Sequence, residues 1–182
     1  MRSTKSVPFA PPWGPKPAWQ EANRSIDDLN QRYFGKLCSA AALAVSLRLR
    51  LESIFSLLDD LCLETCPRCP DPCCLNASPW FDFRDLLFLH LNSLAIPSSQ
   101  TIETSKAVCR YYRPQGCTLP RISRPWICTW YLCSVQTANL NSRRATQRKD
   151  LTVAVNEIKA LRKEMEETDI RVIAYSGSLS ST

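Results

Sequence analysis

Glycine and histidine are both scarce in this chain of 182 residues, and their scarcity excludes several kinds of site. The four glycines, Gly14, Gly35, Gly116 and Gly177, are isolated and lie far apart. A Walker loop or a dinucleotide-binding turn needs several glycines within a few residues, so that backbone N–H groups can approach phosphate. The single histidine, His90, argues against a histidine-rich catalytic metal centre and against a Ser-His-Asp triad.

Long apolar runs are also missing. The apolar stretch 37–47 is shorter than the roughly 20 residues needed to span a bilayer, and Arg48 and Arg50 follow it at once. The opening residues contain five prolines by Pro17 and no continuous apolar segment of the kind found in a secretory signal. The sequence therefore predicts a cytoplasmic protein without a membrane partner.

Cysteine, in contrast, is abundant. Ten cysteines are present, nine of them between Cys62 and Cys133, and only Cys38 lies outside this window. A secreted disulfide scaffold is one explanation for dense cysteine, but a cytosolic chain keeps its thiols reduced. Clustered reduced thiols at short spacing are metal ligands more often than anything else. Cys38 falls on the apolar side of a predicted helix, where we expect a buried thiol that acts as a small hydrophobic group.

The candidate ligands form two groups along the chain. Cys66 and Cys69 have a CxxC spacing, which lets one tight loop place two thiolates on one metal, and Cys62 lies one helical turn before Cys66. The adjacent Cys73 and Cys74 indicate a bent loop, a bridge between two metals, or one ligand beside one packed thiol. The full predicted set is Cys62, Cys66, Cys69, Cys73, Cys74, Cys109, Cys117, Cys128 and Cys133. These thiols suffice for two tetrahedral sites, or for one iron–sulfur cluster with thiols to spare.

The arrangement of the two groups, separated by an apolar helix, resembles the YkgJ-type cysteine-cluster family, which is described as chelating zinc or iron. The positions that match the family's CxxC…CC motif are Cys66, Cys69, Cys73 and Cys74, with one extra residue before the doublet. Those that match its C…GC.L….RP..C segment are Cys109, Cys117, Cys128 and the pair Arg124-Pro125, and Asp82 or Asp85 would be its acidic helix position. The resemblance covers about residues 62–135, and Thr118-Leu119-Pro120 departs from the isoleucine-tyrosine usual after the cysteine.

The resemblance implies that the chain binds zinc or iron, as single ions or as an iron–sulfur cluster. Some relatives in that family are flagellin lysine methylases, so an iron–sulfur redox or methylase-type enzyme, or the partner of such an enzyme, is an alternative. The sequence identifies no catalytic residue.

Charge is distributed unevenly, because the stretch 104–149 contains no Asp or Glu and nine basic residues. One interpretation is a zinc-dependent nucleic-acid-binding module, with stacking platforms at Tyr111, Tyr112, Trp126, Trp130 and Tyr131. The interpretation that we favour is compensation of thiolate charge, in which Arg124 and Arg110 donate hydrogen bonds to the metal ligands. It is favoured because the basic residues interleave with the cysteines.

The predicted fold is mainly helical, with long antiparallel helices packed beside an irregular cysteine-rich metal-binding region. Its divisions are a flexible Pro-rich arm at 1–24, a long helix at 25–61, the cysteine-cluster domain at 62–135, a C-terminal helix at 136–168 and a flexible tail at 169–182. We expect a helix break near Gly35, docking of Trp13 and Trp19, and a helix that begins after Ser78-Pro79 and carries a packed His90. The C-terminal stripe Leu151, Ala154, Ile158, Leu161 and Met165 would pack on the first helix, or alternatively form the seam of a homodimer or a protein partner.

Overall fold

The computed structural model describes residues 10–104, 107–114 and 116–179, and these are mainly helical, as predicted. The α-helices are α1 (Lys16–Arg32), α2 (Cys38–Thr65), α3 (Cys73–Asn76), α4 (Phe83–Leu91), α5 (Trp126–Trp130), α6 (Ser134–Arg143) and α7 (Ala145–Leu179). Short 3-10 turns are η1 (Phe34–Lys36), η2 (Cys66–Arg68) and η3 (Arg121–Ser123). Strands β1 (Tyr112–Arg113) and β2 (Gly116–Cys117) form an antiparallel hairpin in which Tyr112 pairs with Cys117.

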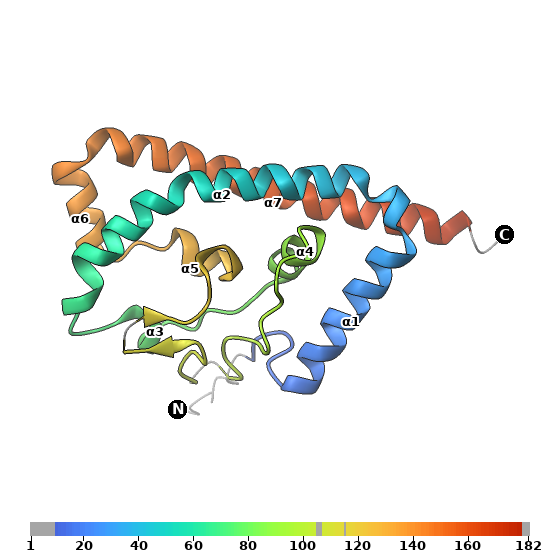
Figure 1. The fold of residues 1–182 in the computed structure, drawn as a ribbon, viewed down its shortest axis with the longest axis horizontal. Coiled ribbons are helices and arrows are strands. Elements are labelled where there is room, and N and C mark those ends of the chain that lie inside the picture. The colour runs from blue at the N-terminus through green and yellow to red at the C-terminus, as the bar shows by residue number, and fades with distance from the viewer. Residues whose placement is uncertain (1–9, 105–106, 115, 180–182) are drawn as a thin grey trace, which may run out of the picture.

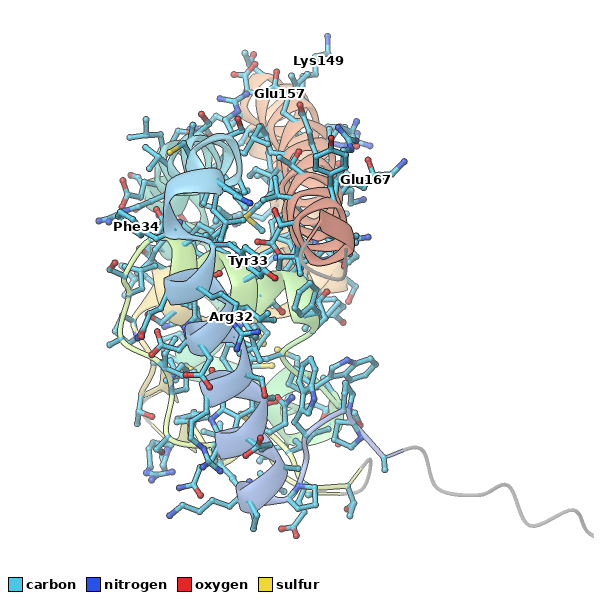
Figure 2. All side chains as sticks on the ribbon, turned by 90° about the vertical axis from the view of Figure 1, so that its right-hand side faces the viewer. Arg32, Tyr33, Phe34, Lys149, Glu157 and Glu167 are labelled. Atoms are coloured by element: carbon cyan, nitrogen blue, oxygen red, sulfur yellow. The ribbon has the colours of Figure 1, made fainter. Side chains whose placement is uncertain are left out.

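The two longest helices, α2 and α7, lie side by side along the molecule (Figure 1). Their cross-contacts run in opposite chain order, since Lys36 just before α2 meets Ser176, while Arg50 meets Glu157 further along. The pair is therefore antiparallel. The predicted apolar stripe of α7 packs into the core, where its buried members are Leu151, Ala154, Ile158 and Met165. A homodimer through the C-terminal helix would need another face of α7, such as the outer one that carries Lys149 and Glu167 (Figure 2).

The predicted break near Gly35 is present. Helix α1 ends at Arg32, and η1 turns the chain into α2, so that α1 descends from one end of the α2–α7 pair (Figure 1). Figure 2 looks at this bend and shows Arg32, Tyr33 and Phe34 where α1 gives way to η1. Phe34 is 83% exposed, so the bend does not depend on burial of its ring.

Helix α1 begins at Lys16, where the sequence predicts a flexible arm up to residue 24. Its start suits a helix N-terminus, because Pro17 falls in the first turn, where a missing N–H costs nothing. Trp19 supplies the tertiary reason: its ring is 2% exposed and tilts against Phe81 at 5.4 Å between centroids, and its Nε1 donates to the Pro97 carbonyl at 2.9 Å. Only the part of the predicted arm at residues 1–9 lies outside the described residues.

The C-terminal region differs from the prediction at both ends. A separate helix, α6, precedes α7, and the two meet at Arg144, whose backbone leaves the helical conformation. Helix α7 continues to Leu179, eleven residues into the predicted flexible tail, because Asp169 and Ser176 are buried on its inner side. The last three residues, 180–182, lie outside the described residues.

Helix α4 is also shorter than predicted and begins at a different cap. Asp82, not Ser78, is its N-cap: the Asp82 carboxylate accepts from the Asp85 N–H at 2.8 Å, and the Asp85 carboxylate accepts from the Asp82 N–H at 3.1 Å. This reciprocal capping box satisfies two N–H groups that would otherwise lack partners. Among the described helices, none combines the length and apolar character that crossing a bilayer requires.

Candidate metal centre

All ten cysteines are free thiols, and those of the predicted ligand set lie on several separate elements. Cys62 and Cys66 stand at the end of α2, Cys73 and Cys74 open α3, Cys117 is in β2, Cys128 is in α5, and Cys133 is the N-cap of α6. Cys109 precedes the hairpin and is the most buried of them, at 9% exposed. The structure thus brings together thiols that are far apart in the chain, since Cys74 and Cys128, 54 residues apart, interact electrostatically.

Four of these thiols, Cys74, Cys109, Cys117 and Cys128, form what we term the four-thiol group. Burial raises the pKa of the Cys128 thiol, and the neighbouring charges of Cys109 and Cys117 raise it further. Burial likewise raises the pKa of Cys109, with a contribution from Cys117. The pKa of Cys74 is raised by its hydrogen bond with Cys73, then by burial, then by Cys128 and Cys109. Each member therefore lies near enough to at least two others for their charges to interact.

Local backbone geometry places three members of the group. Gly116 has a φ of +119°, which an L side chain rarely adopts, and this glycine lets the hairpin turn so that Cys117 pairs opposite Tyr112. The Tyr112 N–H donates to the Cys109 carbonyl at 3.1 Å, which keeps Cys109 beside the same hairpin. Cys128 sits in the first turn of α5, where its N–H donates to the Pro125 carbonyl at 2.9 Å.

A second set, which we term the Gln136 group, comprises Cys62, Cys66 and Cys133. The Gln136 amide Nε2 donates to the sulfur of Cys62 at 3.7 Å and to that of Cys66 at 3.9 Å. Its Oε1 accepts from the Cys133 N–H at 3.3 Å, while the Cys133 sulfur accepts from the Gln136 N–H in a reciprocal capping box. Gln136 is only 6% exposed, so one buried amide gathers three predicted ligands.

The remaining two predicted ligands are Cys73, which interacts with both Cys66 and Cys74, and Cys69. A hydrogen bond from Cys74 lowers the pKa of Cys73 to about 6, more than burial raises it. Burial raises the pKa of Cys66 to about 11, helped by the charges of Cys62 and Cys73. Cys69 is half-buried at the end of η2, and its N–H donates to the Cys66 carbonyl at 3.1 Å.

The two predicted arginines occupy different surroundings. Arg124 lies near the four-thiol group: its charge lowers the pKa of Cys128, although burial dominates, and its Nε donates to the Leu119 carbonyl at 3.0 Å. Arg110 instead ties down the loop before the hairpin, donating to Glu103 at 2.7 Å and to the Gln100 carbonyl at 3.4 Å. Among the described side chains, Arg121 donates to a predicted ligand, through Nη2 to the Cys62 sulfur at 3.6 Å.

The basic stretch finds acidic partners elsewhere in the chain. Arg121 pairs with Asp59, and Arg144 pairs with Asp60 and Glu64, all on the C-terminal half of α2. The acidic end of α2 therefore offsets charge that the sequence alone leaves unbalanced.

Three of the five predicted stacking platforms are also engaged within the chain. Tyr111 donates through its hydroxyl to the Ser99 carbonyl at 2.8 Å, and Trp126 and Trp130 pack together at 6.3 Å between centroids. Tyr131 is the half-exposed exception, at 48%. The nucleic-acid-binding interpretation stays a prediction.

His90 and Cys38 lie outside both sets of thiols, and the sequence predicts that each is packed or buried and binds no metal. His90 is packed as expected, with its side chain 9% exposed and its Nε2 at 3.0 Å from Asn23 Oδ1. Cys38 is exposed, not buried, because it opens α2 and its sulfur donates to the Gly35 carbonyl at 3.6 Å instead of facing the core.

No three Cys, His, Asp or Glu side chains in the described part of the chain already stand where they could hold one metal ion together. A metal would have to draw the thiols closer than they lie here. Comparison with protein-family models, with curated proteins and with solved structures gives no match for this chain.

Sequence reasoning missed two residues whose side chains donate to the thiols, Gln136 and Arg121, and it also missed the buried Arg162. The spacing of Cys133 and Gln136 is that of a capping box, with cysteine in place of serine or threonine, so a signal for Gln136 was present. No local pattern marks Arg162, which lies on α7 and contacts α4 from 77 residues away.

Proposed function

We propose that the four-thiol group, Cys74, Cys109, Cys117 and Cys128, binds a single zinc or iron ion. Four thiolates in a tetrahedral arrangement are a common structural site for zinc, with no position left open for a substrate. The observation that carries the proposal is the convergence of these four thiols, from α3, from the hairpin region and from α5, within range of one another's charge.

Burial supports the same proposal. Burial raises the pKa of the Cys109 and Cys128 thiols, which favours their protonated forms, and a metal ion provides the charge that lets several thiols ionise side by side. Four thiolates around a divalent ion carry a net charge of −2, and Arg124 stands close enough to Cys128 to offset part of it. The resemblance of the CC doublet and the RPxxC turn to the YkgJ-type family also favours zinc or iron.

The chemistry that such an ion would supply is structural. It would join three segments that otherwise meet only through short elements and loops, so its binding energy would be folding energy for this half of the chain. The chain's own residues would hold the ligands in place: Pro125 sets the first turn of α5, and Gly116 sets the hairpin turn.

The test is the metal content of protein purified without oxygen, measured by elemental analysis together with a visible spectrum. Cys117→Ser should lose most of the bound metal, whereas Cys38→Ser, which alters an exposed thiol outside both sets, should retain it. Zinc in a colourless protein, or iron without sulfide, supports the single ion, whereas iron together with sulfide would replace the single ion with an iron–sulfur cluster. Equal metal content in the two variants, or no zinc or iron in the wild-type protein, would contradict the proposal.

The number of ions per chain tests the Gln136 group in the same experiment. If Cys66→Ser lowers the metal content by one ion while Cys117→Ser lowers it by another, the two sets bind separately. If Cys66→Ser has no effect, the Gln136 group is a packed set of thiols, and the predicted ligand set contracts to the four-thiol group.

A further inference from the structure

Arg162 is a buried arginine that joins α7 to two carboxylates of the capping box of α4. It is 5% exposed, and its Nη1 donates to Asp85 Oδ1 at 2.6 Å. Its Nη2 donates to both oxygens of Asp82, at 2.9 and 3.0 Å. A planar guanidinium can serve two carboxylates at once in a way that the point charge of a lysine cannot. The pairing also compensates an Asp85 side chain that is itself buried.

Asp85 connects this cluster to the metal-binding side. The same oxygen, Oδ1, accepts from the backbone N–H of Trp126 at 3.1 Å, and Trp126 is the first residue of α5. The guanidinium of Arg162 also lies over the Trp126 ring, 5.7 Å from its centroid. N–H groups in the first turn of a helix have no partner within the helix, so this carboxylate determines where α5 starts. Cys128 follows two residues later.

On the basis of the proposed four-thiol centre, we propose that Arg162 is a positioning residue for Cys128. It holds the Asp85 carboxylate in the direction that fixes the first turn of α5, and that turn sets the place of the Cys128 sulfur among the other three thiols. Arg162 would act through Asp85 and not on the metal. Figure 1 shows that α4 and α5 both lie beneath the α2–α7 pair.

The test variant is Arg162→Lys, and its matched control is Arg84→Lys. Arg84 also joins α4 to α7, through Glu166 at 2.7 Å, but it is more exposed and its ion pair does not involve α5. The first measurement uses metal-free protein: the rate at which N-ethylmaleimide labels Cys128, followed by peptide mass spectrometry, with Cys62 on α2 as the internal reference. We expect Cys128 to be labelled several-fold faster in Arg162→Lys and at the wild-type rate in Arg84→Lys, with Cys62 unchanged in both.

The second measurement is titration with cobalt(II), whose absorption reports thiolate ligands directly. Arg162→Lys should weaken cobalt affinity by about 10-fold or more, the range seen when groups that orient ligands are lost. Its ligand-field bands should also shift, which a general loss of stability would not cause. Asp85→Asn, which keeps an acceptor oxygen but removes the charge, should move both measurements in the same direction and serves if Arg162→Lys does not fold.

The outcomes separate the two proposals. Wild-type cobalt affinity and labelling in both Arg162→Lys and Asp85→Asn would overturn the positioning role and leave the four-thiol centre standing. Equal acceleration at Cys62 and Cys128 would also overturn it, because it indicates a general loosening. No cobalt binding by the wild-type protein would overturn the four-thiol centre and the positioning role with it.

Discussion

The two halves of this molecule are held together by different kinds of interaction. The α2–α7 pair is joined by apolar side chains at helical spacing, such as Leu47 and Ile158, both fully buried. The cysteine-bearing half contains short helices and a two-residue-per-strand hairpin, and its buried groups include Gln100, Asp85 and Gln136. Apolar burial tolerates local variation in geometry, whereas a buried amide or carboxylate needs partners at defined positions. The second half is therefore the one in which single polar side chains, or a metal, decide the conformation.

We expect the largest difference between the two halves when the metal is removed. If the four-thiol group binds an ion, chelation under reducing conditions should abolish amide hydrogen-exchange protection in α5 and in the hairpin, because their connection to α3 is lost. The centres of α2 and α7 should stay protected. Identical exchange in both halves before and after chelation would show that the metal does not hold the cysteine-bearing half.

The apolar half should be broken by a single truncation in its core. Leu47→Ala should lower the free energy of unfolding by about 4 kcal/mol, because a fully buried leucine loses its contacts and leaves a cavity. Leu49→Ala on the same helix is the control: this side chain is 63% exposed, so the expected change is within about 0.5 kcal/mol. Urea unfolding followed by far-UV circular dichroism measures both, and similar losses would show that α2 does not bury the face assigned to it.

The corresponding change in the polar half is Gln100→Ala. The Gln100 amide is fully buried, accepts from the N–H groups of Phe81 at 2.7 Å and Thr101 at 3.0 Å, and donates to the Pro12 and Phe81 carbonyls. Truncation leaves these buried groups without their partner, so we expect a loss of about 3 kcal/mol in urea unfolding.

Gln31→Ala is the matched control, since its amide donates to Asp27 on the surface of α1. A loss for Gln100→Ala as small as that for Gln31→Ala would mean that water satisfies the groups that Gln100 now serves.

The smallest effect concerns a carboxylate within the apolar half. Asp169 is 2% exposed, and burial raises its pKa from 3.8 to about 6. As the pH falls, the folded state therefore takes up a proton at Asp169 before the unfolded state does. The contribution of Asp169 to the free energy of unfolding thus increases as the pH falls from about 6 to about 4. Asp169→Asn, neutral at every pH, should remove this dependence and raise stability at pH 8 by about 1 kcal/mol.

The measurement is the difference in melting temperature between the variant and the wild-type protein, at pH 5 and at pH 8. Asp150→Asn, at an exposed position of the same helix, should change neither value. A stabilisation by Asp169→Asn that is equal at both pH values would exclude the titration of Asp169 as its cause.

The helical half could be predicted from the sequence, because the periodicity of apolar residues is a local property. The stripe from Leu151 to Met165 predicts which side of α7 is buried, and the step at Gly35 predicts where the first helical segment divides. The predictions that differ from the structure are those in which the environment of a residue depends on how distant segments pack. Cys38 has an apolar local pattern but is exposed, because the helix starts at that residue.

For the candidate centre, the sequence determined which thiols are available, and the fold divided them. Spacing alone treats Cys62, Cys66 and Cys69 as one group with the CC doublet. In the structure Cys62 and Cys66 accept hydrogen bonds from Gln136, whereas Cys74 interacts with Cys109 and Cys128. Cys73 interacts with both Cys66 and Cys74. This division depends on where α3, the hairpin, α5 and α6 meet, and no local spacing contains that information.

By itself the sequence determined a mainly helical chain, the apolar faces of its long helices and an excess of thiols in one window, since composition and periodicity need no knowledge of distant partners. Only the tertiary structure decided that α1 begins at Lys16 through the burial of Trp19, and that α4 is capped by Asp82. It also decided that Arg162 meets Asp85 and Trp126. Each of these depends on a polar or aromatic group finding a partner from another part of the chain, and such a contact forms only when packing brings the two segments together.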